Sequence, residues 1–137
     1  MLDIKFIREN IDLVKLAVTK KKMTVDLDRL VQVDDSRREV MQSLEEKRAE
    51  QNRISDGIPT ATDQAVRQQL ITEMQALKQE VQKNEEALRP IIEQWQALML
   101  QVPNIPDMSV PDGDSDADNE EMKTWGEKHK FDFEAKD

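Results

Sequence analysis

Apolar residues recur with a 4-3 spacing along the middle of this chain. From residue 70 to residue 102, nine of ten positions at this spacing are apolar, and Asn84 is the exception. We call these positions the downstream seam: Leu70, Met74, Leu77, Val81, Asn84, Leu88, Ile91, Trp95, Leu98 and Val102. A 4-3 spacing places all of these side chains on one narrow stripe of an α-helix, which is typical of a coiled-coil strand. Such a stripe requires a partner.

A second stretch with the same spacing precedes the first, and six of its nine members are apolar. This upstream seam consists of Leu30, Val33, Arg37, Val40, Leu44, Lys47, Gln51, Ile54 and Ile58. Gly57 and Pro59 break helix chemistry between the two seams, and Thr62 or Asp63 can cap the helix that follows. The pattern predicts an antiparallel hairpin over residues 26–102, with its turn near residues 57–62.

The turn also suggests how the two helices pair. If the turn is centred between Thr60 and Ala61, the numbers of facing residues sum to 121, and Asn84 lies opposite Arg37. At about 1.5 Å per residue the arm extends roughly 45 Å, which is too long and thin to enclose a substrate. Pro90 predicts a local bend in the second helix.

The two ends of the chain differ from the arm. Residues 1–25 predict a short segment at Ile4–Ile7 and then a helix that Asn10 caps and that ends near Lys20. We expect this base to pack on Leu27, Trp95 and Leu98. Residues 103–137 hold prolines and an acidic run that predict a linker, in which Phe131 and Phe133 alternate as in a short strand. The predicted fold class is all-α: a long antiparallel two-helix coiled-coil hairpin on a small helical base, with an irregular C-terminal linker.

Composition and charge limit the possible partners. Charged residues make up 36% and aromatic residues 4% of 137 residues, with no cysteine and a net charge of −9. An acidic total argues against indiscriminate binding to DNA or RNA, so any nucleic-acid contact must be a local basic patch. The chain lacks a secretory signal and any run of 18 apolar residues, so we expect a soluble, cytoplasmic protein without a membrane partner.

Catalytic chemistry is not evident. The lone His129 stands between lysines, where we expect a solvated surface histidine, and the three glycines are scattered rather than grouped in a phosphate loop. Acidic pairs such as Glu45 and Glu46 fall on a solvent face of the helix. We therefore expect no catalytic residue, no metal site and no cofactor within this chain.

The two edges of the predicted hairpin differ in charge. We call one the cationic edge, because it holds three cations against one anion: Arg38, Met41, Glu45, Arg48, Asn52, Ser55, Gln68, Ile71, Gln75, Lys78 and Gln82. The other, the acidic edge, holds five acids against two cations: Glu39, Glu46, Glu50, Glu73, Glu80, Arg53 and Lys83. In an antiparallel pair the e positions of both helices share one side, so we expect Arg48 and Lys78 to be neighbours. Cationic and amide side chains on one ridge can contact RNA phosphates and sugar hydroxyls without reading bases, although such residues are also ordinary solvated flanks of a coiled coil.

Short motifs along the whole chain resemble those of a known family. Met1–Lys5 with Ile7–Asn10, then Val25–Asp28 and Ala49–Ser55, are similar to the N-terminal arm of seryl-tRNA synthetases. Further motifs resemble the link from that arm into the catalytic domain: Val102–Pro106, Val110–Gly113, Asp118–Asn119, Trp125–Gly126 and Phe131–Glu134. Each motif is short, but their order and spacing around a hairpin favour the resemblance.

The resemblance implies a module for recognition rather than for chemistry. The full enzyme would be a class II synthetase, a homodimer that activates serine with ATP and Mg²⁺ in a separate catalytic domain beyond Asp137. Its arm would bind serine tRNA at the long variable arm and elbow, by shape and phosphate contacts. This chain has Gln51 and Asp56 where family members often have basic residues, which removes positive charge near the tip. The candidate tRNA-binding residues are therefore Arg38, Arg48, Asn52, Gln75 and Lys78 on the cationic edge, together with Arg53.

Two other interpretations remain open from the residues. The hairpin could be a coiled-coil adaptor that binds a protein partner, in which case its binding would lack the steep salt dependence of phosphate contacts. A free-standing enzyme would require catalytic residues that the sequence does not display.

Overall fold

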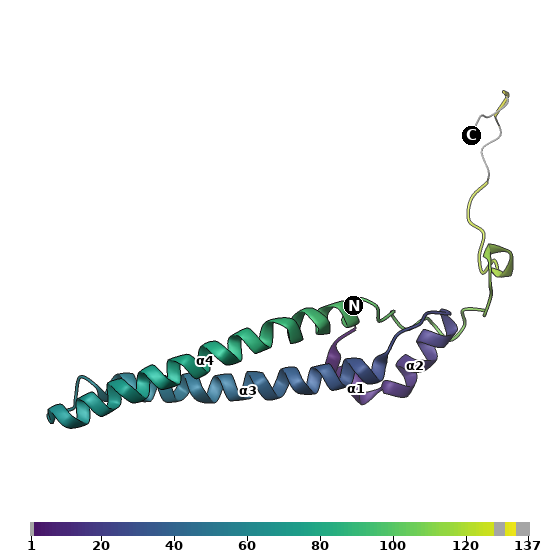
Figure 1. Ribbon diagram of the computed structural model, residues 1–137. Coiled ribbons are helices and arrows are strands. Elements are labelled where there is room, and N and C mark those ends of the chain that lie inside the picture. Colours follow the sequence, from purple (N-terminus) through teal and green to yellow (C-terminus); the bar gives the residue numbers. More distant parts are fainter. Residues whose placement is uncertain (1, 128–130, 134–137) are drawn as a thin grey trace. The chain divides into compact units, whose positions relative to one another are not determined.

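A computed structural model describes residues 2–127 and 131–133 of the chain. Its elements are α1 (Ile4–Glu9), α2 (Ile11–Lys20), α3 (Leu27–Gly57), α4 (Gln64–Met99) and the short 3₁₀ helix η1 (Asp116–Asp118) (Figure 1). The chain divides into two units, Met1–Ile105 and Pro106–Asp137. The described residues hold helices and no strand, which confirms the predicted all-α class.

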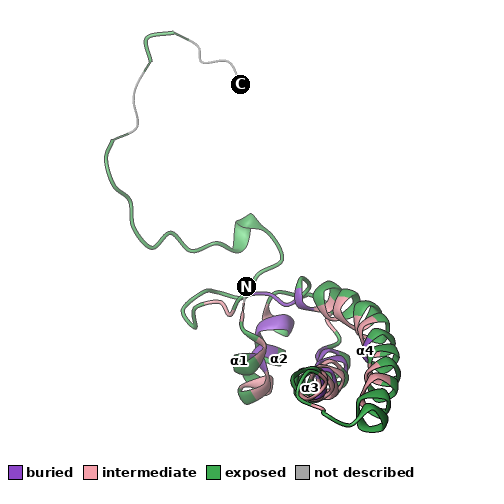
Figure 2. Cartoon of the chain, turned by 90° about the vertical axis from the view of Figure 1, so that its left-hand side faces the viewer, coloured by how far each residue is buried: buried purple, intermediate pink, exposed green. Residues whose placement is uncertain are grey.

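Helices α3 and α4 form the predicted hairpin, and both seams face inward. Every residue of the two seams is buried or half-buried. Figure 2 shows exposed residues along the outer side of α4 and half-buried residues along its inner side. The ends are capped as expected, because the Asp63 carboxylate accepts a hydrogen bond from the backbone N–H of Ala65 at 2.7 Å and α3 stops at Gly57.

The predicted register of the hairpin was wrong. Asn84 donates to the Ser43 hydroxyl at 3.0 Å and Lys47 pairs with Glu80, and the residue numbers of both pairs sum to 127. This value lies near 128, at which the same two seams also meet, displaced by one heptad from the predicted sum of 121. The 4-3 pattern repeats every seven residues, so it cannot distinguish these registers. The turn does not choose between them, because α3 ends at Gly57 and α4 begins at Gln64, which centres the turn between Thr60 and Ala61 as predicted. The contacts between the two helices identify the displaced register.

Pro90 does not interrupt α4. The helix is continuous from Gln64 to Met99 with Pro90 inside it. Figures 1 and 2 show a gentle curve along α4 rather than a sharp kink. The local bend predicted at this residue is therefore spread along the helix.

A small foot closes the open end of the hairpin. Its core gathers apolar side chains from all four α-helices and the residue stretch after α4: Ile7, Val14, Val18, Leu27, Leu30, Met99 and Val102, with Trp95 and Leu98 packed beside them. This confirms that the base packs on Leu27, Trp95 and Leu98. Asn10 is the N-cap residue of α2, as predicted, but its side chain makes no capping hydrogen bond there, because its amide donates back to the Phe6 carbonyl at 3.0 Å.

A buried carboxylate ties the foot to the hairpin. Asp34 on α3 is 1% exposed and accepts hydrogen bonds from Arg8 of α1 at 3.1 Å and from Arg37 at 2.8 Å. The Arg37 guanidinium lies 4.7 Å from the ring centroid of Trp95 on α4, at cation–π distance. A hydrogen bond to Asp35 holds the pKa of Arg8 above its ordinary value. One ionic cluster therefore joins α1, α3 and α4.

The second unit contains little packed structure. The Asp118 carboxylate accepts hydrogen bonds from the backbone N–H groups of Asp114 at 2.7 Å and Ser115 at 3.1 Å, which closes a tight acidic turn around η1. Phe131 and Phe133 lie with their ring centroids 5.1 Å apart, but residues 131–133 form a bend and not the predicted strand. His129, expected to be a solvated surface residue, lies outside the described residues.

Candidate nucleic-acid interface

The hairpin exposes the candidate residues of the cationic edge. All five of these side chains, on the solvent side of α3 and α4, are exposed: Arg38, Arg48, Asn52, Gln75 and Lys78. Their exposure follows from the heptad spacing, because side chains at positions that flank an inward-facing seam remain at the edge of the helix pair. Exposed cationic and amide side chains on two parallel ridges can reach RNA phosphates without leaving the helical scaffold.

Arg48 is already held by an acid from the other helix. Its guanidinium donates to the Glu85 carboxylate at 2.7 Å, and the two side chains are 56% and 41% exposed. Sequence reasoning missed Glu85, because the cationic edge was counted on α4 only as far as Gln82. The signal was available, since Glu85 lies seven residues after Lys78 and therefore repeats its heptad position.

Two shallow hollows follow this edge. One, of about 480 Å³, is lined by Gln51, Lys78, Val81, Gln82, Glu85, Glu86 and Arg89. The other, of about 390 Å³, is lined by Met41, Leu44, Glu45, Arg48, Glu85, Leu88, Arg89 and Ile92. Lys78 lines the first hollow and Arg48 lines the second. Glu85 and Arg89 belong to both hollows.

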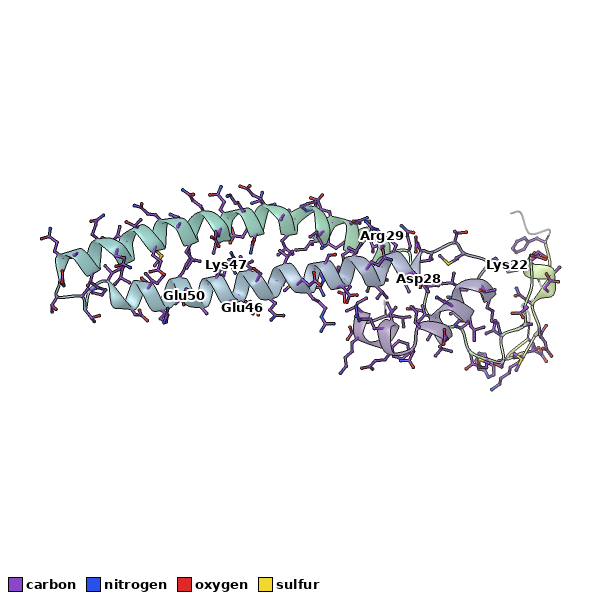
Figure 3. The ribbon with its side chains drawn as sticks, turned by 60° about the horizontal axis from the view of Figure 1, so that its bottom comes forward. Lys22, Asp28, Arg29, Glu46, Lys47 and Glu50 are labelled. Atoms are coloured by element: carbon purple, nitrogen blue, oxygen red, sulfur yellow. The ribbon has the colours of Figure 1, made fainter. Side chains whose placement is uncertain are left out.

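The acidic edge carries its own ion pairs. Lys47 reaches across the hairpin to Glu80, and this hydrogen bond holds the pKa of Glu80 below its ordinary value. Figure 3 shows Lys47 between the two helices, with Glu46 on the side of α3 that faces away from α4. Arg53 is bound to Glu50 of its own helix at 2.5 Å and 2.9 Å, and this contact raises its pKa. Arg53 is therefore apart from the other candidates and less available to a ligand.

Among residues 2–127 and 131–133 there is no group of three or more His, Asp or Glu side chains that could hold a metal ion. Over the same residues, no helix has the length and apolar character needed to cross a membrane. The arrangement on the arm is suited to binding a long, charged surface.

The family model described as the seryl-tRNA synthetase N-terminal domain matches residues 1–106. The chain belongs to this family. The match covers the foot and the whole hairpin, which are the parts in which the fold is packed.

Relatives of this seryl-tRNA synthetase family extend the similarity into the second unit. Serine–tRNA ligase of Geotalea uraniireducens is 40% identical over 136 residues, which is 99% of this chain and 32% of that protein. Serine–tRNA ligase of Caldanaerobacter subterraneus subsp. tengcongensis is 43% identical over 137 residues, with the same coverage. The chain spans about a third of the length of these curated relatives.

A solved structure shares the fold. The crystal structure of seryl-tRNA synthetase from Pyrococcus horikoshii complexed with ATP aligns with a TM-score of 0.66 and 26% sequence identity. The alignment covers 92% of this chain and 29% of that chain. The structural alignment thus agrees with the family match from the sequence.

Proposed function

We propose that this chain is the tRNA-binding arm of a serine–tRNA ligase. Its family match over residues 1–106 carries the proposal, and the hairpin with one cationic edge supports it. The arm binds serine tRNA at its long variable arm and elbow. It does so mainly by shape and by phosphate contacts, because its exposed edge offers cationic and amide groups on an open surface.

The side chains of the cationic edge make different contacts with the RNA. Arg48 and Lys78, on opposite helices, bind phosphates, and Arg38 adds a further cation nearer to the foot. Asn52 and Gln75 donate to phosphate or sugar oxygens between them. Arg53 contributes less, because Glu50 holds its guanidinium. The hairpin sets the spacing of these groups, so an RNA surface of matching shape meets all of them together.

The chemical step belongs to the rest of a longer protein. The relatives that this chain matches are about three times as long, and their name, serine–tRNA ligase, denotes ligation of serine to tRNA. A class II catalytic domain in the remainder uses ATP and Mg²⁺, and the full cytoplasmic protein works as a homodimer. This chain supplies RNA recognition.

A binding experiment with two RNAs tests the proposal. The 137-residue chain is titrated with serine tRNA and with the same tRNA lacking its long variable arm, at salt concentrations from 50 to 200 mM. We expect salt-sensitive binding to the complete tRNA and loss of most of that binding after the deletion. Equal binding to both RNAs would contradict recognition of the variable arm. Binding that does not respond to salt would favour the alternative of an adaptor for a protein partner.

Two double charge reversals compare the edges. Arg48→Glu with Lys78→Glu should abolish binding to serine tRNA. Arg53→Glu with Lys83→Glu introduces the same change in net charge on the acidic edge and should have a much smaller effect. Equal losses from the two double variants would overturn the assignment of the cationic edge.

A further inference from the structure

The two hollows on the cationic edge have balanced charge. Their lining holds three cations, Arg48, Lys78 and Arg89, and three acids, Glu45, Glu85 and Glu86. A phosphate that approaches this surface therefore meets little net attraction until one of the acidic side chains moves away from its cation. The way in which the edge binds RNA therefore depends on which acidic side chain is displaced.

Glu85 is the acidic side chain that a phosphate can displace. Its carboxylate accepts from the Arg48 guanidinium at 2.7 Å across the hairpin, while Glu86 accepts from Gln82 of its own helix at 2.9 Å. A carboxylate and a phosphate bind a guanidinium through the same planar donors, so they compete for it. Glu85 and Arg48 are both more than one third exposed, so a phosphate can reach the pair without unfolding of the arm.

Arg89 lines the same hollows as Glu85. It lies one helical turn after Glu85 on α4. A phosphate that displaces Glu85 from Arg48 in one hollow therefore lies near Arg89 as well. Arg89 repeats the heptad position of Gln82 and Gln75, so the cationic edge continues beyond the residues that the sequence singled out.

We propose that Glu85 is a specificity-determining residue of the arm: it binds Arg48 in the free protein, and an RNA phosphate displaces it from Arg48 on binding. Arg89 is a further phosphate contact. This inference rests on the proposed function. Because Glu85 must be displaced, a phosphate that reaches Arg48 alone gains little. An RNA backbone that reaches Arg48, Lys78 and Arg89 together offsets the loss of the ion pair.

A matched pair of neutralising variants tests Glu85. Glu85→Gln removes the acid of the ion pair on the cationic edge, and Glu80→Gln removes the acid of the Lys47 pair on the acidic edge, with the same change in net charge. We expect Glu85→Gln to tighten binding to serine tRNA roughly 3- to 10-fold at 50 mM salt, and Glu80→Gln to change it less than about twofold. Arg89→Gln should weaken binding and reduce the slope of log K against log salt by about 1.

A double-mutant cycle shows whether Glu85 acts through Arg48. In a chain that already carries Arg48→Gln, the added Glu85→Gln should give less than about a twofold gain, because the group that it releases is absent. Far-ultraviolet circular dichroism and thermal unfolding of each variant measure folding separately from binding. Equal gains from Glu85→Gln and Glu80→Gln, or a full gain without Arg48, would overturn this inference while leaving the proposed function in place. Absence of salt-sensitive tRNA binding by every variant would overturn both.

Discussion

The foot and the arm use the same kinds of residue in different ways. In the foot, Ile7, Val14 and Leu30 are completely buried and come from three helices. Along the outer arm, the most buried side chains are Leu44 at 7%, Ile54 at 4% and Val81 at 8%, and most other seam residues are half-buried. Two helices alone surround a side chain less completely than the four helices that meet in the foot.

This difference separates stability from recognition. Burial of apolar area is the main favourable term in folding, so the foot contributes more stability per residue than the arm does. The arm instead presents two long exposed edges at fixed spacing. Substitutions should therefore have their largest effects on unfolding in the foot and smaller effects along the arm.

The largest expected effect comes from a cavity in the foot. Leu30→Ala should lower the free energy of unfolding by about 2–5 kcal/mol, because Leu30 is fully buried and its neighbours cannot fill the space. Leu77→Ala removes the same atoms from the half-buried seam and should cost only about 1–2 kcal/mol. Urea unfolding followed by circular dichroism measures both variants. Equal losses would break the comparison between the two regions.

The buried carboxylate of the foot should give the next effect. Asp34→Asn leaves Arg8 and Arg37 without their shared anion and should lower the free energy of unfolding by about 2 kcal/mol. Asp35→Asn removes a carboxylate that is 48% exposed and also contacts Arg8, and it should cost about 0.5 kcal/mol. Thermal unfolding of the two variants checks this order. A loss from Asp35→Asn as large as that from Asp34→Asn would show that burial is not the cause.

A polar pair within the arm should contribute less than the foot does. Ser43→Ala removes the acceptor of the Asn84 amide and should cost about 1 kcal/mol, because a partly buried donor then lacks its partner. Replacing both residues, as Ser43→Ala with Asn84→Leu, should recover most of that loss, since no unsatisfied polar group remains. Urea unfolding would contradict the observed register if Ser43→Ala left the midpoint unchanged.

The smallest effect concerns pH and the Lys47–Glu80 pair. The pKa of Glu80 is lowered in the folded chain, so its contribution to stability is fully present above the ordinary pKa of glutamate. That contribution is lost as the pH falls through the lowered pKa of the folded state. The difference in unfolding free energy between the wild type and Glu80→Gln should therefore be greatest near neutral pH and vanish in acid. Acid titration of both proteins in urea measures it, and a difference independent of pH would contradict the assigned cause.

Local patterns were enough to predict most of the fold. The 4-3 spacing identified both seams, Gly57 and Asp63 marked the turn, and the apolar residues near the start of the chain predicted the foot. The same spacing placed Arg48 and Lys78 at exposed edge positions. These features depend on the period of the helix and on capping by neighbouring residues, which the sequence contains directly.

The tertiary structure decided the features that depend on pairing. A heptad pattern is unchanged when one helix slides by seven residues, so the sequence could not choose between Ser43 and Arg37 as the residue near Asn84. The heptad position of Glu85 could be found from the sequence, but its pairing with Arg48 depends on the register. The sequence by itself determined which faces of the helices turn inward, because that follows from spacing along one chain. The register and the ion pairs across the arm depend on how the two helices pack together, and they are visible only when both helices are in place.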